Sequence, residues 1–138
     1  MLREEMRIVV LGSGRVGSHL ANTMVSEGHV LIVVDEKAGK FKSLNDHANI
    51  HRIHGNIFEE KISQRAFAEK ADVFVVVTGN DNINIMAAQA MQKKFPIPEV
   101  LIRIFDPDLA DVYRSLGFHI VCPTNYTLSE MMRMLGEK

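Results

Sequence analysis

Apolar and polar residues alternate in blocks along this chain, and the blocks predict six strands separated by helices. Six short runs are apolar at almost every position, which is typical of strands buried on both faces of a parallel sheet. Longer segments between them mix apolar and polar residues at helical spacing. The predicted strands cover residues 6–11, 30–35, 50–54, 73–77, 100–105 and 118–122. The predicted helices cover residues 16–27, 37–46, 59–69, 82–94, 106–116 and 126–135.

The first and last of these helices have informative apolar patterns. In the first, Val16, Leu20 and Met24 recur every four residues, which places them on one face of the helix. The last helix has four apolar residues within five positions, covering more than one face. It either packs on its own sheet or offers part of its surface to another subunit, and we favour the second interpretation. These four residues are Met131, Met132, Met134 and Leu135.

The regular alternation of strands and helices predicts the fold class. Right-handed crossovers between parallel strands lead to an α/β, Rossmann-like, doubly wound sheet with strand order 3-2-1-4-5-6 and helices on both faces. Residues 1–138 form one domain in this interpretation, with no C-terminal companion domain in the chain. Dinucleotide-dependent dehydrogenases generally need a further substrate domain, so this organisation argues against such an enzyme.

Composition narrows the class of protein further. The chain is 46% hydrophobic and 24% charged, with a net charge of −1, which gives no sign of a nucleic-acid-binding surface. Cys122 is the only cysteine, so no internal disulfide is expected. The charged residues 1–5 lead directly into a strand, and no apolar run approaches the length of a membrane span. We therefore expect a cytoplasmic protein.

A glycine-rich loop joins the first predicted strand to the first predicted helix. Gly12, Gly14 and Gly17 form the Gly-x-Gly-x-x-Gly pattern, in which the glycines permit a sharp turn, close approach of a pyrophosphate, and tight packing of helix on strand. The N-terminus of the helix attracts phosphate through free N–H groups and the helix dipole. Arg15 either pairs with a phosphate or points to solvent. The candidate residues of this loop are Gly12, Ser13, Gly14, Arg15, Val16 and Gly17.

An acidic residue ends the second predicted strand at the spacing expected of a ribose-binding carboxylate. Asp35 lies 21 residues after Gly14. Its charge disfavours a 2′-phosphate, although Lys37 is near, so NAD is expected in preference to NADP. Glu36 and Lys37 complete this second candidate loop.

Two more loops and one arginine converge at the same end of the predicted sheet. The third loop is placed to reach an adenine edge, and the fourth follows the most apolar strand. Asp81 either contacts the ligand or is only a helix N-cap. Arg103, in an otherwise apolar strand, needs a carboxylate or phosphate partner. These candidate residues are Gly55, Asn56, Ile57, Thr78, Gly79, Asn80, Asp81 and Arg103.

Other functions receive less support from the sequence. A small NAD-dependent oxidoreductase, or a fragment of one, would need a catalytic His, Tyr/Lys or Cys beside the nicotinamide, and we identify no catalytic residue. The histidines do not suggest a metal site. A structural unit with an empty crevice and an assembly module with a vestigial site remain alternatives.

Together these features resemble a known family, the RCK or KTN domains, also called TrkA-N domains, which are regulatory domains of potassium transporters and channels. The resemblance covers essentially the whole chain. It rests on residues 8–17, 33–35, 55–56, 77–84 and 101–104, followed by Asp106 and Pro107. The family typically has an aspartate where this chain has Asn56.

The resemblance implies a nucleotide-sensing regulatory subunit rather than an enzyme. The implied ligand is NAD(H), with ATP, ADP or another adenine nucleotide as alternatives. The implied partners are a second copy of the chain, a higher ring of copies, a membrane potassium-transporter subunit and a separately encoded C-terminal domain protein. Such a subunit lies at the inner face of the membrane through its partner, and gates it by a ligand-dependent change of the dimer or ring.

Overall fold

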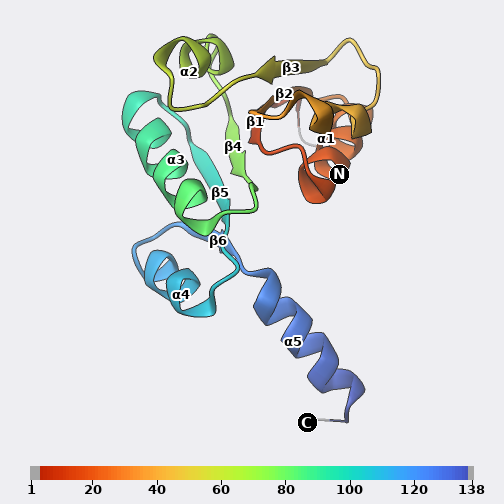
Figure 1. Cartoon of the computed structure of the whole chain (residues 1–138), viewed down its shortest axis with the longest axis vertical. Helices are drawn as coiled ribbons and strands as arrows, with labels where there is room; N and C mark the ends of the chain where they lie inside the picture. Colours follow the sequence, from red (N-terminus) through yellow and green to blue (C-terminus); the bar gives the residue numbers. More distant parts are fainter. Residues whose placement is uncertain (1–3, 137–138) are drawn as a thin grey trace.

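The computed structural model describes residues 4–136, so residues 1–3 of the charged N-terminal segment lie outside the described part. One parallel sheet forms its centre, in the order β3-β2-β1-β4-β5-β6 (Figure 1), which confirms the predicted fold class and topology. The strands are β1 Arg7–Leu11, β2 Val30–Asp35, β3 Ile50–His54, β4 Val73–Val76, β5 Glu99–Arg103 and β6 His119–Val121.

Alternate residues of the strands supply two separate cores, one on each face of the sheet. Val9, Ile32 and Phe74 belong to the core under helices α2 Glu60–Ala66, α3 Asp81–Lys94 and α4 Pro107–Ser115. Val10 and Val33 belong to the opposite core, under α1 Arg15–Ser26 and the short helix η1 Ala38–Ser43. Because consecutive strand residues point to opposite faces, runs that are apolar throughout can fill both cores.

One local prediction on the α1 side was wrong. The segment 37–46 does not form an α-helix; only Ala38–Ser43 is helical, as a 3₁₀ turn. It contains Gly39 and offers few apolar side chains to the sheet, so little holds a longer helix in place. In α1, the buried residues are Gly17, Ser18, Ala21 and Val25. Leu20 and Met24 are partly buried against the same core, whereas Val16 is 51% exposed. The glycine loop requires close packing at Gly17, and this rotates the buried face by one residue.

The last helix, α5 Pro123–Met134, extends away from the rest of the molecule (Figure 1). It begins three residues before its predicted start, with proline in the first turn, where the missing N–H is harmless. None of its residues is buried. Tyr126, Leu128 and Met131 are each more than half exposed. The expectation of an exposed apolar helix, rather than one packed on its own sheet, is therefore confirmed.

Candidate functional site

A cavity of about 490 Å³ opens beyond the carboxyl ends of the central strands, within the size range of small-molecule sites. Most of the predicted loops meet there. The lining residues predicted from the sequence are Gly12, Gly14, Asp35, Glu36, Lys37, Asn56, Ile57, Thr78, Gly79, Asn80 and Arg103. The predicted residues outside the lining are Ser13, Arg15, Val16, Gly17, Gly55 and Asp81. The lining residues missed by sequence reasoning are Leu11, Val34, Lys40, Phe58, Val77 and Ile83.

The three glycines of the first loop have different surroundings. Gly12 has a φ of +107°, and a Cβ there would lie 2.8 Å from the carbonyl oxygen of Val77. A Cβ on Gly17 would lie 1.9 Å from the carbonyl oxygen of Gly12. Gly14 has ordinary extended dihedrals, and a Cβ there would meet nothing within 4 Å. The first and third glycines are therefore required by the fold, whereas Gly14 leaves open space at the cavity wall.

The N-terminus of α1 begins directly after Gly14. Arg15, Val16 and Gly17 are its first three residues, and their N–H groups have no carbonyl of a preceding turn to bind. Gly14 is the N-cap, but it has no side chain to accept a hydrogen bond from these groups. The arrangement suits an anion, because free N–H donors and the positive end of the helix dipole coincide.

Asp35 ends β2 and connects the first two loops. It is 8% exposed. Its Oδ2 accepts a hydrogen bond from the Ser13 N–H at 2.9 Å, and its Oδ1 accepts one from the Lys37 N–H at 2.8 Å. Oδ2 also accepts the Ser13 hydroxyl at 3.4 Å, whereas Oδ1 has a second lone pair, so the side chain holds the glycine loop in place and retains acceptor capacity at Oδ1.

The third loop places one residue for packing and two for contact with the cavity. A Cβ on Gly55 would lie 2.5 Å from Cδ1 of Ile62, so this glycine allows α2 to pack closely on the loop. Asn56 lines the cavity, and its Oδ1 accepts the N–H of Phe58 at 2.8 Å. Phe58 also lines the cavity and is 41% exposed. Its position two residues after Asn56 in a predicted ligand loop was the available sequence signal.

The fourth loop is held by Asn84, a fully buried amide on α3. Its Oδ1 accepts both the backbone N–H and the hydroxyl of Thr78, and its Nδ2 donates to the carbonyl oxygens of Thr78 and Arg103, at 3.1 and 2.9 Å. The amide thus fastens the loop after β4 to the end of β5. A polar residue on the buried face of an otherwise regular helix was the sequence signal for it.

Asn80 and Asp81, at the start of α3, have roles that the sequence only partly indicated. Asn80, not Asp81, is the N-cap of α3, and its Oδ1 accepts the Ile83 N–H at 3.0 Å. The Asp81 carboxylate instead accepts the N–H groups of Phe105 and Asp106, at 2.8 and 3.0 Å. Asp81 therefore joins α3 to the segment after β5.

Among the described residues Arg103 bonds backbone carbonyls instead of the expected carboxylate, and its alternative phosphate partner stays a prediction. Its Nη2 donates to the carbonyl oxygens of Val77 and Thr78, at 2.9 and 3.1 Å. Its guanidinium lies over the Phe105 ring, 4.8 Å from the centroid. Burial lowers the pKa of Arg103, and the nearby Asp81 partly opposes this shift. Among the described residues its buried Nε has no hydrogen-bond partner, while the residue itself belongs to the cavity lining.

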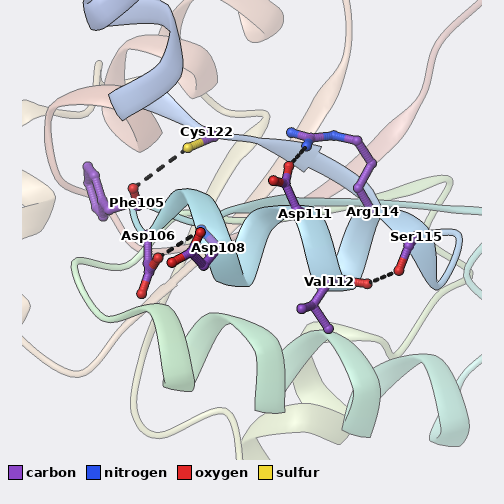
Figure 2. A network of polar contacts seen from close by, with 8 residues as sticks. All are labelled: Phe105, Asp106, Asp108, Asp111, Val112, Arg114, Ser115 and Cys122. Carbon is purple, nitrogen blue, oxygen red and sulfur yellow. Dashed lines mark hydrogen bonds and ion pairs between the residues drawn. The ribbon is translucent and has the colours of Figure 1, made fainter.

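Figure 2 shows how this region continues toward α5. Cys122, the residue before α5, points its sulfur at the carbonyl oxygen of Phe105, at 3.6 Å. Thr124 donates its hydroxyl to the same oxygen at 2.6 Å. Asp106 caps α4 by accepting the Asp108 N–H (Figure 2). The first residues of α5 are thus bound to Phe105, whose ring contacts a side chain of the cavity.

Two properties concern the described chain as a whole. No helix within residues 4–136 combines the length and apolar character needed to cross a bilayer. In the same range, no three or more His, Cys, Asp or Glu side chains are grouped in a way that could hold a metal ion.

Most of the chain is similar in sequence to a known protein family. The family model described as the TrkA-N domain matches residues 8–123. The chain belongs to the TrkA-N family. A relative of this TrkA-N domain is the Trk system potassium uptake protein TrkA of Streptomyces coelicolor, 36% identical over 130 residues. The match covers 94% of this chain but only 58% of that protein's length.

Solved structures share the fold of this TrkA-N domain. The GsuK channel bound to NAD superposes with a TM-score of 0.81 at 19% identity, covering 97% of this chain and 24% of that one. The Kef CTD of Shewanella denitrificans in its AMP-bound form has a TM-score of 0.75 at 17% identity, covering 94% and 82%. At this level of identity the likeness concerns the fold alone.

Proposed function

We propose that this TrkA-N domain is a nucleotide-sensing regulatory module of a potassium uptake system. The observation that carries the proposal is the open space at Gly14, which lines the cavity at the carboxyl ends of the strands and directly precedes the free N–H groups of α1. Its TrkA relative and the NAD- and AMP-bound neighbours support the same interpretation. The ligand in this proposal is NAD(H), with ATP, ADP or AMP as alternatives.

The chemistry of the cavity suits an anionic ligand held for detection rather than conversion. Its lining contains three cationic and two anionic side chains: Lys37, Lys40, Arg103, Asp35 and Glu36. The described lining includes no histidine, cysteine or tyrosine, the residue types that most often transfer protons or act as nucleophiles in such sites. We therefore propose a sensor in preference to the NAD-dependent oxidoreductase that the glycine loop also allows.

In this proposal, the effect of ligand binding is transmitted to α5 through Arg103. A phosphate near Arg103 would pair with its guanidinium charge and so compensate the desolvation that lowers the pKa of this side chain. Any resulting shift of the guanidinium acts on the Phe105 ring beneath it. The carbonyl of Phe105 holds Thr124 on the first turn of α5, so the direction of this helix depends on the state of the cavity.

A second copy of the chain is the proposed partner of α5. The helix has no buried residue, and the neighbouring end of one sheet face is also uncovered, with Val121 42% exposed. Exposed apolar surface of this extent marks an interaction site. Two copies exchanging α5 would cover both surfaces, and a ligand that prefers one angle between them would shift that population. A coupling of about 1–3 kcal/mol suffices for such regulation.

The remaining partners follow from the family. We propose that the dimer, or a ring of dimers, acts on a membrane potassium-transporter subunit and lies at the membrane only through it. The family resemblance also implies a separately encoded C-terminal domain protein, which we propose as a further partner.

Calorimetric titration of the purified protein with NAD⁺, NADH, ATP, ADP and AMP tests the proposal. We expect at least one of them to bind, and the Gly14→Val variant to lose that binding while remaining folded. Mass spectrometry of material that copurifies with the protein identifies the ligand retained from the cell. If none of the five nucleotides binds, the proposed function is wrong.

A further inference from the structure

The order of the strands decides which loop meets which part of a nucleotide. Phosphates belong at the N-terminus of α1, after β1, and the ribose belongs at Asp35, at the end of β2. The next strand in the sheet is β3, and the Gly55 N–H donates to the carbonyl of Asp35 at 3.0 Å. A base attached to that ribose therefore lies over the loop after β3, where Asn56 and Phe58 line the cavity.

The orientation of the Asn56 amide follows from its hydrogen bond. The atom facing the Phe58 N–H must be the oxygen, because an N–H group needs an acceptor. The other end of the amide is thus the NH₂ group, and no described residue accepts a hydrogen bond from it. Asn56 therefore offers the cavity donors, whereas an aspartate at this position would keep the same bond to Phe58 and offer an acceptor.

Phe58 supplies the apolar contact beside this donor. Phe58 lines the cavity and is 41% exposed as a residue, although the neighbouring Ile57 is buried. An exposed aromatic face next to a polar group is the arrangement on which nucleic acid bases stack, and stacking tolerates different bases because each has a π-face.

We propose that Asn56 and Phe58 form a base-recognition site that takes a purine through an acceptor atom on its edge. The exocyclic 6-amino group of adenine is then not required for binding. This inference rests on the proposed function, because it assumes that a nucleotide occupies the cavity. The added claim is that the site donates a hydrogen bond to an acceptor atom of the purine ring. It does not contact the amine that distinguishes adenine from other purines.

The test compares AMP with purine riboside 5′-monophosphate, which differs only in lacking the 6-amino group. AMP is the portion common to NAD⁺ and ATP, and the analogue keeps its ribose, its phosphate and its purine ring. We expect the dissociation constants of the wild-type protein for the two ligands to agree within about threefold. Asn56→Asp replaces the donor by an acceptor and should make the analogue bind about tenfold more weakly than AMP, since only the amine can satisfy the carboxylate.

The ratio of the two dissociation constants is measured on the same variant. Repulsion between the new carboxylate and the phosphate weakens both ligands equally, so it does not change this ratio. Phe58→Ala should weaken both ligands alike, by about 5- to 100-fold. Met86→Ala is the matched control, because Met86 is 57% exposed on α3 and does not line the cavity. It should change neither dissociation constant.

Each possible result supports or overturns the inference about base recognition. A wild-type preference of more than about tenfold for AMP over the analogue would overturn the inference. So would an unchanged ratio in Asn56→Asp, or full affinity in Phe58→Ala. A protein that binds NAD⁺ but not AMP would also overturn it, while leaving the proposed function standing. If no nucleotide binds, the proposed function fails first and this inference with it.

Discussion

Replacing Gly14 by serine should separate nucleotide binding from stability more cleanly than any other change in the glycine loop. Gly14 is the N-cap of α1, with φ −71° and ψ −160°, dihedrals that serine adopts without strain. A Cβ at this position meets open space. A serine hydroxyl could accept one of the free N–H groups of the first turn, which glycine cannot do.

The expected effect on stability is therefore small and favourable. Serine in place of glycine at an N-cap adds a few tenths of a kcal/mol, and loss of glycine from the unfolded chain adds about 0.4–1 kcal/mol. We expect Gly14→Ser to raise the free energy of unfolding by about 0.5–1.5 kcal/mol. The same side chain occupies the space through which a phosphate would approach, so nucleotide affinity should fall by at least about tenfold, or 1.4 kcal/mol.

Gly17→Ala is the matched contrast within the same loop. Its Cβ would lie 1.9 Å from the backbone oxygen of Gly12, which cannot move without disturbing the turn at Gly12. We expect a loss of stability on the order of 3 kcal/mol, as for severe overpacking. Any loss of binding in this variant would follow from the damaged fold.

Urea unfolding monitored by circular dichroism, without nucleotide, gives the stabilities, and calorimetry gives the affinities. The expected pattern is a stable Gly14→Ser protein that does not bind and a destabilised Gly17→Ala protein. The reasoning is refuted if Gly14→Ser binds nucleotide as tightly as wild type, or if Gly17→Ala unfolds at the wild-type urea concentration.

Three further predictions concern the network behind the cavity and the last helix. Asn84→Ala should lower the free energy of unfolding by about 3 kcal/mol, because it leaves buried groups at Thr78 and Arg103 unpaired; urea unfolding measures this. Thr124→Val should leave nucleotide affinity within about twofold but abolish the effect of nucleotide on dimer association measured by analytical ultracentrifugation, and an unchanged effect would rule out the route through Phe105. Met131→Glu should weaken dimerisation at least about tenfold in the same assay without lowering unfolding stability, because the side chain is 58% exposed; an undisturbed dimer would exclude this face of α5.

Features set by short-range patterns were predictable from the sequence. The six apolar runs identified all the strands, because burial on both faces leaves a continuous signal, and alternation with helices then led to the strand order. Asp35 and Asn56 could be placed at the cavity by counting from strand ends. The exposed apolar face of α5 was also visible as a pattern.

Features set by contacts between distant residues could not be obtained in this way. The partners of Arg103 are backbone carbonyls of another strand end, which carry no sequence signal. Asp81 was recognised as polar and near a helix start, but its bonds to the segment after β5 depend on how two loops meet in space. The α-helix predicted over residues 37–46 was wrong because its stability depends on packing against the sheet, which the local sequence does not reveal.

The geometry of α5 makes it a lever. Its 12 residues rise about 18 Å at 1.5 Å per residue. A rotation of about 10° at its first turn, where Thr124 is held, would carry Met134 sideways by about 3 Å. Packed interfaces are sensitive to changes as small as one methylene group. A displacement too small to alter the sheet could therefore force a partner seated on the far end of the helix to change its packing.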